Sequence, residues 1–248
     1  MSDTQRDKIT ASDVSGIKQF YDEVYHVGAE AASVGPSRHD FRLTKKLGIR
    51  NGESVLDVAC GTGGWLEACK ERGASVAGID LSTRAIAVCR QRIPEGEFHD
   101  QPAETLPFSD GEFDVVTCLG SLEHFLNPVA SLREMVRVAK PDARFCILVP
   151  NSDFLTRKLG LFKGTYQVTA KEVVRSLEEW DTLFTQAGLC VDRRWRDLHV
   201  LNLNWITRGS PIMWPVRALQ ALVLPLWPLR WQYQVYHVCR AEPSAFVH

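Results

Sequence analysis

The sequence predicts an α/β fold with a mostly parallel sheet, and two stretches carry this prediction. In residues 55–65 a short apolar run with β-branched residues leads into a Gly-rich turn, and residues 66–70 continue as a helix. Residues 75–79 form a second apolar run, which ends at Asp80. A strand, a tight glycine turn, a helix and a strand ending in an acid form the layout of an α/β fold that binds a nucleotide-like ligand.

The glycine turn and Asp80 indicate how such a ligand would be held. Glycine lets a ligand approach the backbone where a Cβ would block it, and it permits a positive φ. Asp80 follows the glycines by about 20 residues, a spacing at which an acid accepts hydrogen bonds from ribose hydroxyls. A glycine turn without a ligand is the simpler alternative.

Two cofactor classes fit the turn. Dinucleotides prefer Gly-x-Gly-x-x-Gly, which Ala59, Gly61 and Gly64 match with one substitution. S-adenosylmethionine (SAM) prefers an acid followed by Gly-x-Gly-x-Gly, and residues 57–63 match that pattern with alanine for the first glycine. The glycines alone leave both classes open.

Length and composition fit one domain over residues 1–248. The net charge of −1 carries no basic excess, so we expect no nucleic-acid partner. Seven cysteines without a Cys-x-x-Cys pair predict reduced thiols in a cytosol-like compartment and no zinc site. The expected segments are a tail and helical cap (1–44), a core (45–198), an apolar insert (199–230), and a last strand with a tail (231–248).

The elements around the turn follow from local patterns. Residues 17–25 and 38–47 have the patterns of helices. Ser82 is a favourable N-cap for a helix through Arg92. A short third strand at 97–100 and a fourth at 113–119 follow, the latter after the turn Gly111-Glu112.

The later elements are predicted from proline, capping and alternation signals. Pro128 favours a helix start, and Pro141-Asp142 a helix end. Ser176 and Glu179 form a capping box. The resulting elements are a helix that carries residues 132–138, strands at 144–149 and 189–195, a helix from 176 to about 187, and a last strand at 231–239.

Five pieces, in order, resemble the class I SAM-dependent methyltransferases. They are the first motif (57–65), the strand with the ribose-binding acid (76–82), the adenine-side loop (102–108), the fourth strand with its Leu-Glu-His ending (113–124), and the helix and turn before strand five (132–141). Within that family the sequence resembles the ubiquinone and menaquinone biosynthesis type (methyltransferase type 11) of small-molecule enzyme. The resemblance covers residues 45–195, and the ordered set is far more specific than any one motif.

The resemblance implies a Rossmann-like sheet of seven mostly parallel strands with helices on both faces. Its strand order is 3-2-1-4-5-7-6 with the last strand antiparallel, and an N-terminal helical cap and a hydrophobic insert before the last strand are added here. It implies methyl transfer from SAM, leaving S-adenosylhomocysteine, to a small-molecule or lipid-like acceptor, with O-methylation favoured over C or N. The expected cofactor residues are Tyr21, Asp57, Ala59, Cys60, Gly61, Gly63, Asp80, Leu81, Pro102, Ala103, Glu104, Leu119 and Gly120. For Tyr21, packing in the core is the alternative.

Glu123 and His124 are the candidate catalytic residues. They follow the fourth strand, at the carboxyl edge where ligands bind in such sheets. A histidine there can act as a general base, because its pKa is readily tuned around neutrality. The alternative is a structural pair that closes the loop before Phe125. Some relatives bind a divalent metal with Glu-x-x-Glu-His, but Gly120 stands at the first Glu position, so no metal is predicted.

Two other function classes share these motifs. A SAM-binding partner subunit without activity would carry the same binding residues, and turnover with any acceptor would separate it from an enzyme. A nicotinamide-dependent dehydrogenase is disfavoured by residues 106–108 and 122–124, which follow the methyltransferase pattern.

Residues 151–175 and 199–230 lie outside the common core. The part 211–229 concentrates two tryptophans and many aliphatic residues, but three prolines and an arginine interrupt it, so it predicts no membrane span. It could be a lid over an apolar acceptor, a homodimer contact in a chain otherwise monomeric, a patch on a membrane surface, or a flap packed on its own core. We therefore expect a cytoplasmic protein, peripheral to a membrane under the third interpretation.

Overall fold

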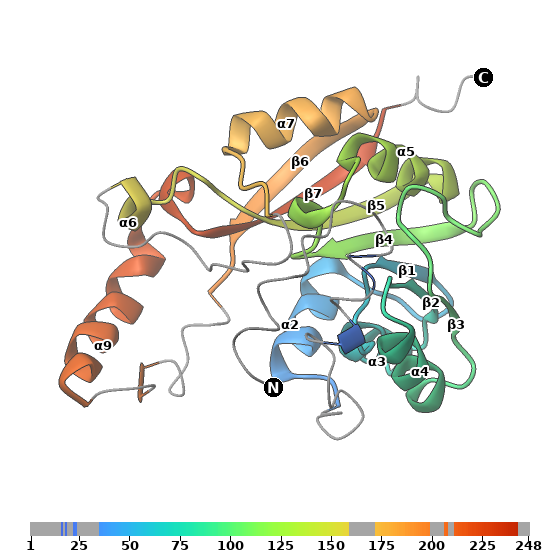
Figure 1. The fold of residues 1–248 in the computed structure, drawn as a ribbon, viewed down its shortest axis with the longest axis horizontal. Coiled ribbons are helices and arrows are strands. Elements are labelled where there is room, and N and C mark those ends of the chain that lie inside the picture. Colours follow the sequence, from blue (N-terminus) through green and yellow to red (C-terminus); the bar gives the residue numbers. More distant parts are fainter. Residues whose placement is uncertain are drawn as a thin grey trace.

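A seven-stranded sheet forms the centre of the molecule, with the order β3-β2-β1-β4-β5-β7-β6 (Figure 1). The computed structural model describes residues 16, 18, 22–23, 35–158, 172–198, 206–207 and 211–242. The strands are β1 (Ser54–Val58), β2 (Ser75–Ile79), β3 (Glu97–His99), β4 (Phe113–Leu119), β5 (Ala139–Pro150), β6 (Leu189–Arg196) and β7 (Gln234–Ala241). Only β7 runs antiparallel to its neighbours, which are β5 and β6. The predicted fold class is confirmed.

Helices cover both faces of the sheet (Figure 1). One face carries α2 (Arg38–Leu47), α3 (Gly64–Lys70) and α4 (Thr83–Arg92), and the other carries α5 (Pro128–Val138) and α7 (Leu177–Gln186). Each face has its own buried cluster, with Leu43, Leu66 and Ile86 in the first and Leu132 and Trp180 in the second. Both faces of the central strands are therefore buried, which explains their continuous apolar sequences.

The parallel register brings the carboxyl ends of the central strands to one edge. Val58 pairs with Ile79, and Leu119 pairs with Leu148. After β1 the chain crosses to α3 on one face, whereas after β4 it crosses to α5 on the other. Such a reversal between neighbouring strands opens a crevice at the carboxyl edge, where ligands bind in open α/β sheets.

Two strands begin three or more residues away from their predicted starts. β5 begins at Ala139, so Pro141-Asp142 lies inside the strand, and a register shift between Phe113 and Val115 of β4 accommodates the irregular stretch. β7 begins at Gln234 because the preceding residues form the short 3₁₀ helix η6 (Leu229–Trp231).

All seven cysteines are described, and all are free thiols. Six are buried, and Cys190 is partly exposed. Cys60 and Cys89 both lie near the carbonyl oxygen of Gly61, at 3.7 and 3.2 Å.

The segments outside the core include α6 (Leu155–Lys158), η4 (Pro211–Met213), α9 (Trp214–Val223) and η5 (Leu224–Leu226). None of the described helices is both long and apolar enough to cross a bilayer. The predicted helix at 17–25 lies mostly outside the described residues, and so does Tyr21.

Candidate functional site

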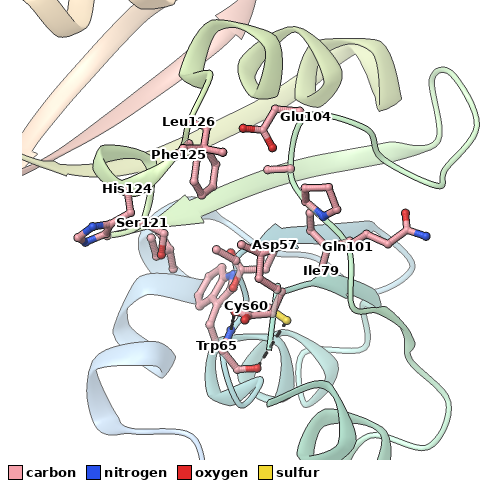
Figure 2. A pocket seen from close by; sticks show the side chains of 18 of the residues that line it. Asp57, Cys60, Trp65, Ile79, Gln101, Glu104, Ser121, His124, Phe125 and Leu126 are labelled. Carbon is pink, nitrogen blue, oxygen red and sulfur yellow. Dashed lines mark hydrogen bonds between the residues drawn. The ribbon is translucent and has the colours of Figure 1, made fainter. Parts of the chain in front are cut away.

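A cavity of about 360 Å³ opens at the carboxyl edge beside β1 and β4 (Figure 2). This volume lies within the range of small-molecule sites. The predicted cofactor residues that line it are Asp57, Ala59, Cys60, Gly61, Asp80, Leu81, Pro102, Ala103, Glu104, Leu119 and Gly120. Gly63 is not among the lining residues, and Tyr21 lies outside the described part of the chain.

The turn after β1 uses its glycines in different ways. Gly61 has a φ of 53°, and a Cβ added to it would meet no atom within 4 Å, so it leaves open space at the cavity. Gly63 has a φ of 78°, but a Cβ there would lie 2.9 Å from the Cys89 sulfur. Gly63 therefore allows α3 and α4 to pack closely. Ala59 adopts a φ of 63° despite its Cβ.

Asp80 joins the turn after β1 to the loop after β2. Its Oδ2 accepts the Gly61 N–H at 2.9 Å, and its Oδ1 accepts the Ser82 N–H at 2.8 Å. Two N-terminal residues reach the same region, because Lys18 pairs with Asp100 at 2.8 Å and Asp22 accepts the Ser82 hydroxyl at 2.6 Å. The acid after β2 thus fixes the floor of the cavity, and part of the N-terminal segment lies against it.

A buried chain of hydrogen bonds ends at the Asp57 carboxylate. The Trp65 indole N–H donates to the Thr117 hydroxyl at 3.1 Å, and that hydroxyl donates to Asp57 Oδ1 at 2.5 Å. Asp57 is 3% exposed, and burial raises the pKa of its carboxyl to about 7, although the Thr117 bond opposes the shift. The cavity therefore holds an acid that changes charge near neutral pH.

The segment after β4 forms one end of the cavity. Figure 2 shows Ser121 and His124 on the side away from Gln101 and Glu104. His124 Nδ1 is buried without a hydrogen-bond partner among the described residues, and desolvation lowers the pKa of the ring. His124 is accordingly neutral at neutral pH, which leaves a ring nitrogen able to accept a proton.

Glu123 faces a different environment from His124. It does not line the cavity, and it is buried, with its Oε2 unpartnered among the described residues. Burial raises the pKa of its carboxyl to about 7. The structure thus brings only one member of the predicted pair to the cavity.

Seven lining residues were not predicted from the sequence: Asp40, Trp65, Ile79, Gln101, Ser121, Phe125 and Leu126. Gln101, Ser121 and Phe125 are neighbours in sequence of residues that were predicted. Extending the predicted site by one residue in the loops after β3 and β4 would have included them. Asp40 lies on α2, far from the motifs in sequence, and nothing local marks it.

Comparisons with known proteins agree with this geometry. A family model described as a methyltransferase domain matches residues 56–147. A demethylmenaquinone methyltransferase of Beutenbergia cavernae is 31% identical over 211 residues, covering 77% of this chain and 86% of that protein. A ubiquinone biosynthesis O-methyltransferase of Hahella chejuensis is 30% identical over 207 residues, covering 79% and 85%. The chain belongs to the SAM-dependent methyltransferases.

A solved SAM-dependent methyltransferase from Aquifex aeolicus shares the fold, with a TM-score of 0.56, 18% identity, and coverage of 92% of this chain and 98% of that one. The methyltransferase family makes SAM the cofactor, and the site fits it. Gly61 and Gly120 leave space where a Cβ would project, since the nearest atom to a Cβ on Gly120 lies 4.0 Å away. No group of metal ligands occurs among the described residues.

Proposed function

We propose that this methyltransferase acts on the hydroxyl of an apolar aromatic acceptor, of the kind represented by quinone precursors, and that His124 is its general base. Both curated relatives carry quinone-pathway names and match most of this chain. The observation that carries the proposal is a neutral histidine at the end of the cavity opposite Gln101 and Glu104, the side that the resemblance assigns to adenine.

The residues beside His124 support an apolar acceptor. Phe125 and Leu126 follow it in the chain and also line the cavity, and Leu126 is 54% exposed. Full burial of an exposed leucine is worth about 1.5–3 kcal/mol, so covering the exposed half of Leu126 with an apolar group would gain roughly half of that. This rim would favour acceptors with a hydrocarbon chain over small polar phenols.

In the proposed reaction, the cofactor residues and His124 have different roles. SAM, when bound, supplies an activated methyl group on a sulfonium sulfur, and Asp57, Gly61, Asp80 and Gly120 would hold it. His124 would take the proton that an acceptor hydroxyl loses as its oxygen becomes methylated, which requires the neutral ring. Glu123 has no contact with the acceptor in this proposal, because it does not line the cavity.

Transfer from labelled SAM to catechols and hydroquinones, each with and without an alkyl chain, tests the proposal. We expect O-methylated products, preferring the alkylated acceptors. His124→Gln should lower kcat by about a hundredfold or more while the Kd for SAM stays within about twofold. His99→Gln, the same change at a histidine that does not line the cavity, is the matched control and should leave kcat unchanged.

The pH profile gives a second readout. The wild-type rate should rise with pH through a value below the ordinary histidine pKa of 6.5 and then level, because the lowered pKa keeps the ring neutral. Products methylated on carbon or nitrogen, or a His124→Gln enzyme of normal rate, would contradict the proposal.

A further inference from the structure

The segment of residues 211–233, here called the arm, leaves the sheet at the edge that holds the cavity. β5 ends where Pro150 pairs with Gln234, the first residue of β7, and β6 ends where Arg196 pairs with Val235. The chain between β6 and β7 therefore begins and ends at the carboxyl edge. In Figure 1 α9 extends from the side of the molecule toward which β4 points.

The arm carries an apolar ridge that faces solvent. Ile212, Leu219, Leu222 and Leu226 are exposed to 84, 62, 73 and 81%. The last three are spaced by three and four residues, which places them on one side of the helical turns. Single exposed apolar residues are ordinary on protein surfaces, whereas four large ones exposed on one short segment are typical of a contact surface.

The base of the arm is held in place by two buried amides. Asn151 Nδ2 donates to the carbonyls of Arg230 and Gln232, at 2.9 and 3.1 Å. Gln232 Nε2 donates to the carbonyls of Leu224 and Trp227, at 2.7 and 3.1 Å. These bonds fold the end of the arm upon itself, so the ridge is presented by an ordered support.

Charge is segregated around the arm. Between Asp197 and Glu242 the sequence contains four arginines and no acidic residue, although the whole chain has 30 acids and 29 Lys and Arg. Arg217 and Arg230 belong to the arm. Next to its base, where the Phe154 ring lies 5.0 Å from that of Tyr233, stands α6, whose Lys158 pairs with Asp153 at 3.0 Å. The arm therefore carries two positive charges and no negative charge, in a chain whose net charge is −1.

We propose that the arm docks on the surface of an anionic lipid bilayer. An exposed apolar face flanked by arginines matches an interface of acyl chains and negative headgroups. The ten residues of α9 are too few to span a bilayer and suit a helix lying in its plane. The cavity shares an edge with the arm, so docking would bring its mouth near the membrane. This inference goes beyond the proposed function and is independent of it, because docking needs no acceptor.

Vesicle flotation tests the docking. The full chain should float with vesicles of equal parts phosphatidylcholine and phosphatidylglycerol, bind phosphatidylcholine vesicles at least about tenfold more weakly, and lose binding as salt rises. The double variant Leu219→Ser with Leu222→Ser should bind the mixed vesicles at least about tenfold more weakly. Gln220→Ser, an exposed change on the same helix, should bind normally.

Variants that remove arginine charges measure the electrostatic contribution to vesicle binding. Arg217→Gln with Arg230→Gln should weaken binding to the mixed vesicles severalfold, whereas Arg240→Gln removes a charge near the opposite end of β7 and should not. SAM affinity should be unchanged in every variant, which shows that each one folds. Equal binding to neutral and mixed vesicles, no flotation, or a dimer in light scattering that the double leucine variant dissociates would each overturn the proposal.

Discussion

Ala59 and Gly61 share a positive φ but differ in what surrounds them. Gly61 leaves open space at the cavity, so Gly61→Val would place a branched side chain in the space proposed for the cofactor and strain the backbone. We expect SAM affinity to fall by about a hundredfold or more. Calorimetric titration measures it, and normal binding by a folded Gly61→Val protein would show that the turn does not hold the ligand.

Ala59→Gly is the matched control for Gly61→Val. Glycine relieves the left-handed strain at this position, which costs a non-glycine residue about 1–2 kcal/mol, but it adds a comparable entropy to the unfolded chain. The free energy of unfolding should therefore change by less than about 1 kcal/mol, and SAM affinity by less than about twofold. Urea unfolding and the same titration would show it.

Asp57 should make cofactor binding depend on pH. Its raised pKa of about 7 leaves it largely protonated in the free protein at mildly acidic pH, and a cationic sulfonium cofactor favours the ionised carboxylate. Binding would then release a proton, and affinity should rise from about pH 6 to about pH 8 before it levels. Titrations in two buffers of different ionisation enthalpy count the proton.

Asp57→Asn provides the comparison. It keeps the shape of the side chain and cannot ionise, so the pH dependence should flatten if Asp57 is its source. An affinity that falls with pH in the wild-type protein would rule out this coupling.

At the level of elements, the sequence predicted most of the sheet because buried parallel strands leave a plain signal. β1, β2 and β4 are apolar runs bounded by turn residues; β1 begins within a residue of its predicted start, and β2 and β4 have their predicted limits. The start of β5 was missed because Pro141-Asp142 has the composition of a turn, and pairing with β4 overrides that local preference.

The arm and part of the cavity were beyond prediction for other reasons. The apolar run in α9 has the same composition whether it is buried or exposed, so the exposure of Leu222 needed the structure. Most of the predicted cofactor residues line the cavity, but Trp65, Ile79 and Ser121 lie within the motifs and were missed. Asp40 reaches it only because α2 packs beside α3, a contact between segments that no local pattern contains.

Gln232 allows a test of how the arm is built. Gln232→Ala would remove two hydrogen bonds, at a cost of about 1–3 kcal/mol, although the Leu224 carbonyl would keep the Trp227 N–H at 3.2 Å. We expect faster protease cleavage within residues 211–233 and unchanged SAM affinity, because no described residue of the arm lines the cavity.

The control for this variant is Gln220→Ala, which changes an exposed glutamine of α9. It should be cleaved at the wild-type rate. If Gln232→Ala also resists cleavage as the wild type does, other contacts hold the arm.

At the scale of the whole molecule, the two apolar clusters share the strands of one sheet. Residues of β1 and β4 contribute to both, for example Leu56 and Val116 to one and Val55 and Val115 to the other. Because neither face can lose its packing without exposing the strands of the other, we expect one cooperative unfolding transition. Coincident melting curves from tryptophan fluorescence and circular dichroism would show it, and two separated transitions would contradict it.

Six cysteine thiols are buried and one is partly exposed, so their rates of chemical modification report how often each part of the fold opens. A thiol reagent should modify Cys190 at once and the others only as the chain transiently opens, so their rates report local opening free energies. Cys60 belongs to the turn after β1 and lines the cavity, and the Cys89 sulfur lies 3.2 Å from the Gly61 carbonyl oxygen. Saturating SAM should slow these two in particular, because a ligand that binds the closed turn lowers the population of the open one. Mass spectrometry of the modified peptides would thus follow SAM binding through the natural cysteines, with no introduced reporter residue.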